Sequence, residues 1–184
     1  VAQEAFEVLR EKGMKYKVVT ITAKEKLCFM DETKCDPVHC PYARGHFDRV
    51  NDAVYELWTT KSRYDRETIR EQAEKWQVCP FEMCLDLSVW VDAVICDYNY
   101  VFDPTVHLKR FFGEGAGGDY IFLIDEAHNL AERGREMYSA SICREDAVRV
   151  RKVMKERAPR LYRSLGKLDK QLKELQVDCG NYLV

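Results

Sequence analysis

The chain has 184 residues and a mass of 21.6 kDa, with 46% hydrophobic residues, 33% charged residues and a formal net charge of −2. This composition is typical of a globular protein and excludes wholesale disorder. No apolar run approaches the roughly 18 residues of a membrane span, and residues 1–10 lack the basic flank and apolar stretch of a signal peptide. We therefore expect a soluble, cytoplasmic protein that does not contact membranes.

The N-terminal half shows the alternation of a helix with buried strands. Apolar residues recur at helical spacing over residues 2–12, and Gly13 marks the end of that predicted helix. Compact apolar runs at 16–22, 94–96 and 120–124 predict strands buried on both faces. Together they predict an α/β fold with part of a parallel sheet.

The stretch between the first two predicted strands does not resemble a simple crossover. Residues 24–42 form a polar loop that carries three cysteines. Helical spacing predicts a helix over 47–57 and a second over 66–76, with Asp65 as the N-cap of the second. We therefore predict a mostly helical insertion with one cysteine-bearing loop.

The C-terminal part is predicted to form an antiparallel helix pair. Leucines at positions 161, 165, 168, 172 and 175 follow alternating steps of four and three residues, which is a heptad seam. Pro159 stands where the first turn of a helix tolerates proline, and residues 145–157 are also helical in pattern. The segment 144–173 is basic beside an acidic remainder, which fits either contact with phosphate or a solvated helix face.

An acidic pair follows the third predicted strand directly. Asp125 and Glu126 begin the sequence Asp-Glu-Ala-His at 125–128. In open α/β sheets, ligands bind beyond the carboxyl ends of the strands, so a Mg²⁺-nucleotide would bind here. Asp125 would hold Mg²⁺ and Glu126 would orient or deprotonate an attacking water. A pair that only caps the next helix is the alternative, and the full tetrapeptide at a strand end favours the nucleotide site.

Eight cysteines in a chain without secretory features point to metal or redox chemistry. Cys28, Cys35, Cys40 and Cys79 are separated by six, four and 38 residues, and four thiolates suit zinc or an iron–sulfur cluster. Because Cys-x-x-Cys knuckles are missing and two of these cysteines precede proline, the spacing favours a cluster over zinc. His39 is a further candidate ligand, and the residues expected as small core side chains are Cys84, Cys96 and Cys143.

Two glycine patterns bear on phosphate binding. Residues 113–118 match G-x-G-x-x-G but precede a predicted strand, whereas a dinucleotide fingerprint follows one, so we interpret them as a loop. The phosphate-binding pattern G-x-x-x-x-G-K-[ST] does not occur in these 184 residues.

Taken together, these motifs resemble the iron–sulfur-containing superfamily-two DNA helicases of the XPD-like and DinG-like group, over most of the chain. Residues 22–28 (TAKEKLC) are similar to the family's entry into its cluster domain, and 78–81 (VCPF) to the segment around the last cluster ligand. Residues 97–104 (DYNYVFDP) resemble the stretch before the ATPase box, and 125–129 (DEAHN) resemble the Walker B motif.

The resemblance implies a role for each of these residues. It implies a [4Fe-4S] cluster on Cys28, Cys35, Cys40 and Cys79. It also implies Asp125 as the residue for Mg²⁺-ATP, Glu126 as the catalytic base, and His128 as the coupler between ATP and DNA.

The resemblance also implies a domain organisation. Residues 1–23 and 91–140 would be parts of a motor domain, 24–90 an iron–sulfur cluster domain, and 141–184 the start of a helical arch domain. The phosphate loop and the second motor domain, with its arginine finger, would lie outside this sequence, so we expect a fragment that is inactive by itself. The short gap between the first two cysteines favours a bacterial or archaeal type.

The expected function is that of an ATP-dependent DNA helicase, an ATP hydrolase of DNA repair that unwinds duplex DNA and guides one strand with its cluster and arch domains. Single-stranded and forked DNA are the expected partners of a monomeric protein. A zinc-stabilised nucleic-acid-binding module without a motor is the first alternative, and a redox protein is the second. Basic residues near aromatic ones are the expected strand contacts, because phosphate charge and base stacking hold single strands: Lys24, Arg44, Arg63, Tyr64, Arg66, Lys109 and Arg110 with Phe111.

Overall fold

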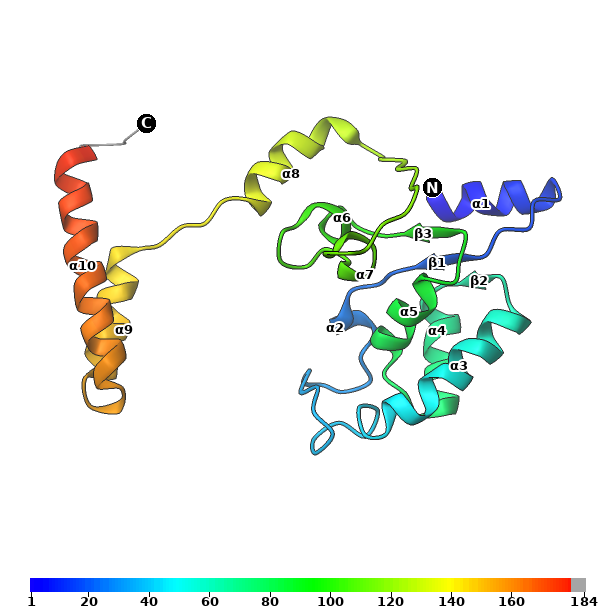
Figure 1. Ribbon diagram of the computed structural model, residues 1–184, viewed down its shortest axis with the longest axis horizontal. Helices are drawn as coiled ribbons and strands as arrows, with labels where there is room; N and C mark the ends of the chain where they lie inside the picture. The colour runs from blue at the N-terminus through cyan, green and yellow to red at the C-terminus, as the bar shows by residue number, and fades with distance from the viewer. Residues whose placement is uncertain (180–184) are drawn as a thin grey trace. The chain divides into compact units, whose positions relative to one another are not determined.

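The structure is a computed structural model that describes residues 1–179 and forms two units, one from Val1 to Asp125 and one from Glu126 onward. The first unit contains strands β1 (Val18–Thr20), β2 (Arg63–Tyr64) and β3 (Ala93–Ile95) and helices α1 (Ala2–Glu11), α2 (Lys24–Leu27), α3 (His46–Thr60), α4 (Arg66–Trp76), α5 (Pro80–Ser88), α6 (Asn99–Phe102) and α7 (Lys109–Phe112) (Figure 1). The second contains the 3₁₀ turn η1 (Ala127–Asn129) and helices α8 (Leu130–Met137), α9 (Arg144–Arg157) and α10 (Pro159–Cys179).

A three-stranded parallel sheet of order β2-β1-β3 lies in the first unit. Val18 pairs with Arg63 on one side and with Ala93 on the other. The predicted helix over 2–12 and the predicted strands near 16–22 and 94–96 are confirmed, with shorter strands. Strand β2 was not predicted, and it shows that the insertion between β1 and β3 contributes a strand to the sheet.

The core of the first unit is shared by the sheet and the insertion helices. The predicted helices over 47–57 and 66–76 form as α3 and α4, and the Asp65 side chain caps α4 by accepting a hydrogen bond from the Thr68 N–H (3.0 Å). Helix α5 adds buried residues that pattern analysis did not assign to a helix. The apolar side chains of this cluster include Val19, Ile21, Leu27, Val50, Ala53, Val54, Leu57, Tyr64, Ile69, Ala73, Val78, Met83 and Leu87.

Glu56 on α3 joins that helix to α4 through three hydrogen bonds. Its carboxylate accepts from Lys75 Nζ (2.5 Å), Trp76 Nε1 (2.6 Å) and Gln72 Nε2 (2.9 Å). These bonds, with that of Lys75 as the largest cause, lower the pKa of Glu56 from 4.5 to about 2. The charged carboxylate is therefore the form that the folded chain stabilises.

Replacing Glu56 by Gln should lower the urea midpoint of unfolding at pH 7. Because the folded-state pKa lies below the unfolded value of 4.5, the carboxylate stabilises the fold above that pH, and this contribution is lost as the pH falls toward about 2. The midpoint difference between variant and wild type should therefore shrink over that interval. Urea titrations followed by circular dichroism at several pH values measure it. Glu74→Gln, an exposed change on α4, is the control, and a difference that does not vary with pH would contradict the assignment.

The predicted strand over 120–124 does not form, and that prediction is wrong. Residues 116–124 have no regular secondary structure, and Ile121 and Leu123 are 91% and 92% exposed. Tyr120 and Phe122 instead pack against Phe112 of α7, with ring centroids 6.0 and 6.1 Å from it. A parallel strand needs a neighbouring strand for its backbone hydrogen bonds, and within residues 1–179 the sheet contains β1, β2 and β3 alone.

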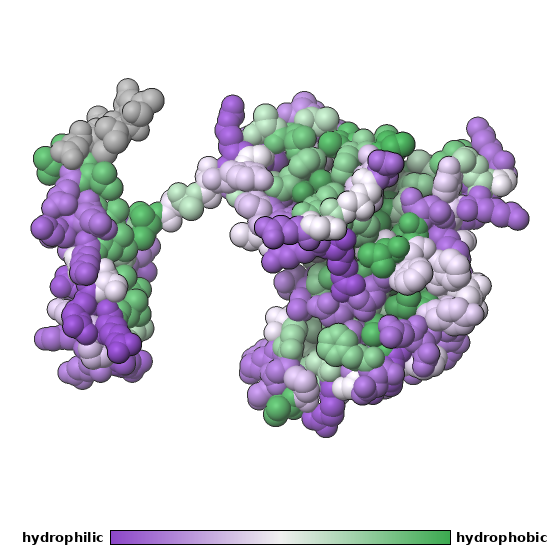
Figure 2. All heavy atoms as spheres, viewed as in Figure 1, coloured by the Kyte–Doolittle hydropathy of each residue, from purple (hydrophilic) through white to green (hydrophobic). Residues whose placement is uncertain are grey.

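In the second unit, helices α9 and α10 pack side by side with one residue between them, as the heptad pattern predicts for a helix pair (Figure 1). Asp169 of α10 is buried, and its Oδ1 accepts a hydrogen bond from Arg144 Nε of α9 (2.7 Å). Hydrophobic residues gather along one side of the pair and hydrophilic residues cover much of its visible face (Figure 2). Within the described residues, no helix is both long and apolar enough to cross a membrane.

Candidate functional site

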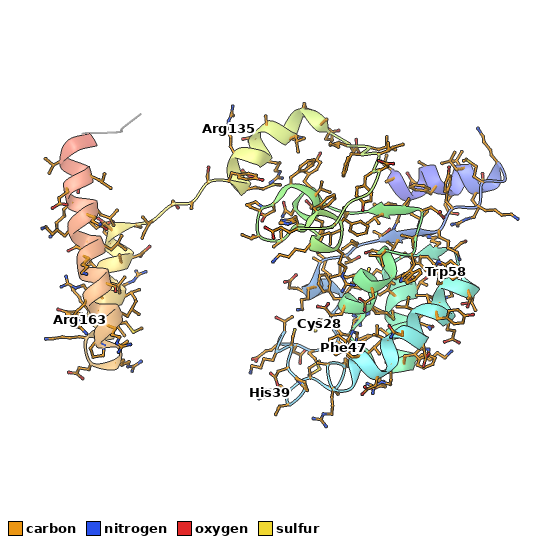
Figure 3. All side chains as sticks on the ribbon, viewed as in Figure 1. Cys28, His39, Phe47, Trp58, Arg135 and Arg163 are labelled. Atoms are coloured by element: carbon orange, nitrogen blue, oxygen red, sulfur yellow. The ribbon has the colours of Figure 1, made fainter. Side chains whose placement is uncertain are left out.

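All four cysteines that the sequence analysis selects as ligands line one pocket of the first unit. Cys28 directly follows α2, Cys35 and Cys40 lie in the loop that leads to α3, and Cys79 is the N-cap of α5. Lys24 and Phe81 line the same pocket. Figure 3 labels Cys28 beside this loop. The pocket is thus lined by thiols that are up to 51 residues apart in sequence.

The four thiols are free, and none of them forms a disulfide. Cys40 is buried, Cys28 and Cys79 are half-buried, and Cys35 is exposed. Among residues 1–179, no three His, Cys, Asp or Glu side chains converge closely enough to hold a metal ion. Four thiols are donors that suit an iron–sulfur cluster or tetrahedral zinc, but in this structure the four cysteines line the pocket without converging on one point.

The loop that carries Cys35 and Cys40 is held by its own polar side chains. Asp36 Oδ1 accepts hydrogen bonds from the N–H groups of Val38 (2.9 Å) and His39 (3.0 Å). Arg44 donates from Nε to the Pro37 carbonyl (3.0 Å). His39 Nδ1 lies 2.8 Å from Asp36 Oδ1, and His39 does not line the pocket (Figure 3). The four cysteines thus line one pocket, and His39, the further candidate ligand, lies outside it.

Lys24 places a positive charge among the thiols. Burial alone would lower the pKa of Lys24, but its hydrogen bond with Cys35 and the charges of Cys35, Glu82 and Cys79 raise it above the usual value. Its Nζ also lies 5.6 Å from the centroid of the Phe81 ring. Burial raises the pKa of the Cys79 thiol above its ordinary value. A cation at this position suits thiolate ligands, because it offsets their negative charge.

The backbone of Cys79 is bound by a residue that the sequence analysis missed. His46, the first residue of α3, is buried, and its Nδ1 accepts a hydrogen bond from the Cys79 N–H (3.2 Å). Burial lowers the pKa of His46. Its position one residue after Gly45 gave no ligand-like spacing, so no sequence signal pointed to it.

The cysteines outside the pocket differ from one another in burial. Cys84 is fully buried on α5, as predicted, and burial raises its pKa to about 12. Cys96 is half-buried. Cys143 is exposed at the N-cap of α9, with its Sγ 2.9 Å from Glu145 Oε2, so its prediction as a core residue is wrong.

The acidic pair lies on an exposed turn before η1. The Tyr98 hydroxyl donates a hydrogen bond to the backbone carbonyl of Asp125, which ties the 97–104 stretch to the start of the box. Glu126 has a left-handed backbone (φ 49°), which is uncommon for a residue with a side chain. His128 Nδ1 lies 3.3 Å from Glu126 Oε2. Asp125 and Glu126 are both exposed residues.

The candidate DNA contacts differ in their exposure to solvent and in whether they form ion pairs. Tyr64 is fully buried and donates its hydroxyl hydrogen to the Lys61 carbonyl, so the prediction that it stacks on a base is wrong. Arg63 forms ion pairs with Glu7 (3.0 Å) and Asp65 (3.1 Å). Arg66 is exposed and makes no ion pair within the described part of the chain. Arg44 lies in the cysteine loop and Lys24 lines the pocket. On α7, Lys109 is exposed, and Arg110 forms ion pairs with Asp86 and Glu82.

Comparison with known proteins gives two findings. A family model described as DEAD_2 matches residues 7–147, a range that includes the cysteine pocket and the acidic pair. The chain is also 31% identical over 104 residues to the Fanconi anemia group J protein homolog of Gallus gallus. The matched segment covers 56% of this chain and 8% of that protein, so the chain spans a small part of its relative.

Proposed function

This chain belongs to the DEAD_2 family of iron–sulfur superfamily-two DNA helicases, and on that premise we propose that it is part of an ATP-dependent DNA helicase whose cysteine pocket holds a [4Fe-4S] cluster. The observation that carries the proposal is the pocket, which four free cysteines line within the range that the family matches.

Cys28, Cys35, Cys40 and Cys79 are the proposed cluster ligands. A bound cluster would cross-link the loop to the ends of α2 and α5 and so hold the pocket closed. The ammonium group of Lys24, which is already drawn toward Cys35 and Cys79, would offset the negative charge of the thiolates. A zinc ion on the same thiols is the alternative, which would make the chain a nucleic-acid-binding module without motor activity.

Asp125 and Glu126 are the proposed carboxylates of the ATPase site. Asp125 would help to hold Mg²⁺ against the phosphates of ATP, and Glu126 would orient and deprotonate the attacking water. His128, which contacts Glu126, would couple the nucleotide to DNA binding. The exposure of both carboxylates and the tie between Tyr98 and Asp125 support this proposal.

The proposed domain organisation follows the family. Residues 1–23 and 91–140 would belong to a motor domain, 24–90 to the cluster domain and 141–184 to the start of an arch domain. The helix pair α9 and α10 lies in the last of these ranges. The partners would be single-stranded and forked DNA, bound by a monomer of bacterial or archaeal type.

Iron and zinc analysis tests the cluster directly. We expect the chain, reconstituted without oxygen with ferrous iron and sulfide, to carry about four iron atoms and to absorb visible light, as a [4Fe-4S] cluster does. A colourless chain that binds one zinc and no iron would support the zinc-stabilised module instead.

Single-stranded DNA should bind to the chain weakly, without sequence preference and with strong salt dependence, because the proposed contacts are phosphates and stacked bases. Arg66→Ala should weaken binding more than Arg63→Ala, since Glu7 and Asp65 already neutralise Arg63. Titration of a fluorescent oligonucleotide at two salt concentrations measures both effects. Each lost phosphate contact should reduce the slope of log K against log salt by roughly 0.7. Equal affinities for wild type and Arg66→Ala would remove Arg66 from the strand path.

A further inference from the structure

The first turn of α3 holds the segment that carries Cys79. His46 is 4% exposed, and its Nδ1 accepts a hydrogen bond from the Cys79 N–H across 33 residues of sequence (3.2 Å). Cys79 is the N-cap of α5, and Pro80 begins the helix. Because Nδ1 is the acceptor, the neutral imidazole carries its proton on Nε2. The bond therefore fixes both the tautomer of His46 and the backbone position from which the Cys79 side chain extends.

Arg49, three residues further along α3, holds the same segment from a second side. Its guanidinium donates to the carbonyls of Trp76 (2.9 Å) and Gln77 (2.6 Å), and also to that of Arg44 (2.8 Å). Gly45 makes this approach possible, because a Cβ at that position would lie 2.6 Å from Arg49 Nη1 and its φ is +65°. The start of α3 thus links the end of the cysteine loop to the chain just before Cys79 without using a thiol.

Packing alone does not account for an imidazole at position 46. Its Nε2 is buried and has no hydrogen-bond partner among the described residues. A buried donor without a partner destabilises a fold, and an apolar side chain of similar size avoids that cost. The acceptor that His46 offers to the Cys79 N–H is the feature that an apolar residue would lack.

We propose that His46 is a positioning residue for Cys79, which holds the start of α5 so that the Cys79 thiol lines the pocket before any metal binds. This inference rests on the proposed function, because it takes Cys79 to be a cluster ligand. His46 itself does not line the pocket and is not a ligand in this proposal.

Two substitutions separate the acceptor from the bulk of the side chain. Asn places a carbonyl oxygen close to the position of Nδ1, so His46→Asn keeps an acceptor for the Cys79 N–H, whereas His46→Leu fills the space and removes it. In the metal-free chain, hydrogen exchange of the Cys79 amide should be about tenfold faster in the Leu variant and near the wild-type rate in the Asn variant. The Ile69 amide, in the core helix α4, is the internal control and should not change in either variant.

The second measurement is the loss of the cluster from the reconstituted chain. With an iron chelator in excess, bleaching of the visible absorbance should be about tenfold faster for His46→Leu than for wild type, which corresponds to one lost hydrogen bond. His46→Asn should bleach at the wild-type rate. If the Leu variant does not fold, the Asn variant decides, since retention of its cluster supports the inference and rapid bleaching overturns it.

Two results would contradict the inference, and a third would contradict the proposed function. An unchanged Cys79 exchange rate in His46→Leu would overturn the inference, because the bond would then not hold the segment. Faster exchange with equal bleaching in all three proteins would also overturn it, because the bond would be structural only. A wild-type chain that takes up no iron at all would instead contradict the proposed function.

Discussion

Replacing Cys79 by serine should abolish the cluster while leaving helices α3, α4 and α5 folded. A serine hydroxyl is a hard, protonated donor and a poor substitute for a soft thiolate, so we expect iron to fall from about four atoms per chain to less than about one. The same result is expected for serine at Cys28, Cys35 and Cys40, because all four line one pocket.

The helices should survive this loss because their core does not include the loop. Leu57 of α3, Ile69 of α4 and Met83 of α5 are fully or almost fully buried against one another and against β1, without a contribution from Cys35 or Cys40 to that cluster. We therefore expect the loop over 28–45, which is held by short polar contacts, to be the part that depends on the cluster.

Three measurements check this prediction. The iron content per chain shows whether the cluster is bound, and circular dichroism shows whether the helices remain folded. Limited proteolysis probes the order of the loop, which should be cut faster in Cys79→Ser than in the cluster-loaded wild type. Cys143→Ser is the matched control, since Cys143 is an exposed thiol outside the pocket. Full iron in the Cys79 variant would remove Cys79 from the ligand set, and collapse of the helical signal would show that the core needs the cluster.

The sequence was most informative where structure depends on local spacing. The helical periods over 47–57 and 66–76 and the leucine seam of α10 each predict an element that the structure contains, and Asp65 caps α4 as its position indicates. The cysteine set could be selected because thiols with proline neighbours in a chain without secretory features have few other uses. Their convergence on one pocket could only be seen in three dimensions.

The failed predictions depend on distant parts of the chain. The apolar run over 120–124 has the composition of a strand, but a strand needs a neighbour, and the described residues place none beside it. Tyr64 looked like an exposed aromatic among basic residues, yet it lies in β2, which is too short to show a period of two, and pairing with β1 buries it. The hydrogen bond between His46 and Cys79 joins two residues that no sequence motif or regular spacing connects.

The largest effect on activity should come from Glu126→Gln in a protein that joins this chain to a phosphate-binding loop and a second motor domain. ATP binding should remain close to the wild-type level, because Asp125 and the phosphate loop would still hold Mg²⁺ and the phosphates. Turnover should fall by about a thousandfold or more, since the amide keeps the shape of the side chain but cannot take a proton from water. The left-handed backbone at position 126 should tolerate glutamine as it does glutamate, so the turn is preserved.

The 184 residues by themselves should hydrolyse no ATP, and this follows from the same site. Magnesium is rarely held by protein groups alone, and these residues contain no phosphate loop to bring nucleotide oxygens to Asp125. Without a bound nucleotide, no water is positioned for Glu126 to deprotonate. The lack of an arginine finger would by itself lower the rate of hydrolysis roughly a thousandfold. Phosphate release with and without single-stranded DNA measures the activity of the isolated chain and of the longer protein. Glu132→Gln, an equal charge change at an exposed position of α8, is the control and should leave the turnover of the longer protein unchanged. DNA-stimulated turnover by the isolated chain would contradict the proposed need for a phosphate loop and an arginine finger. Normal turnover by the longer Glu126→Gln protein would mean that Glu126 is not the base, because catalysis would then proceed without the proton acceptor that the proposal assigns to the water.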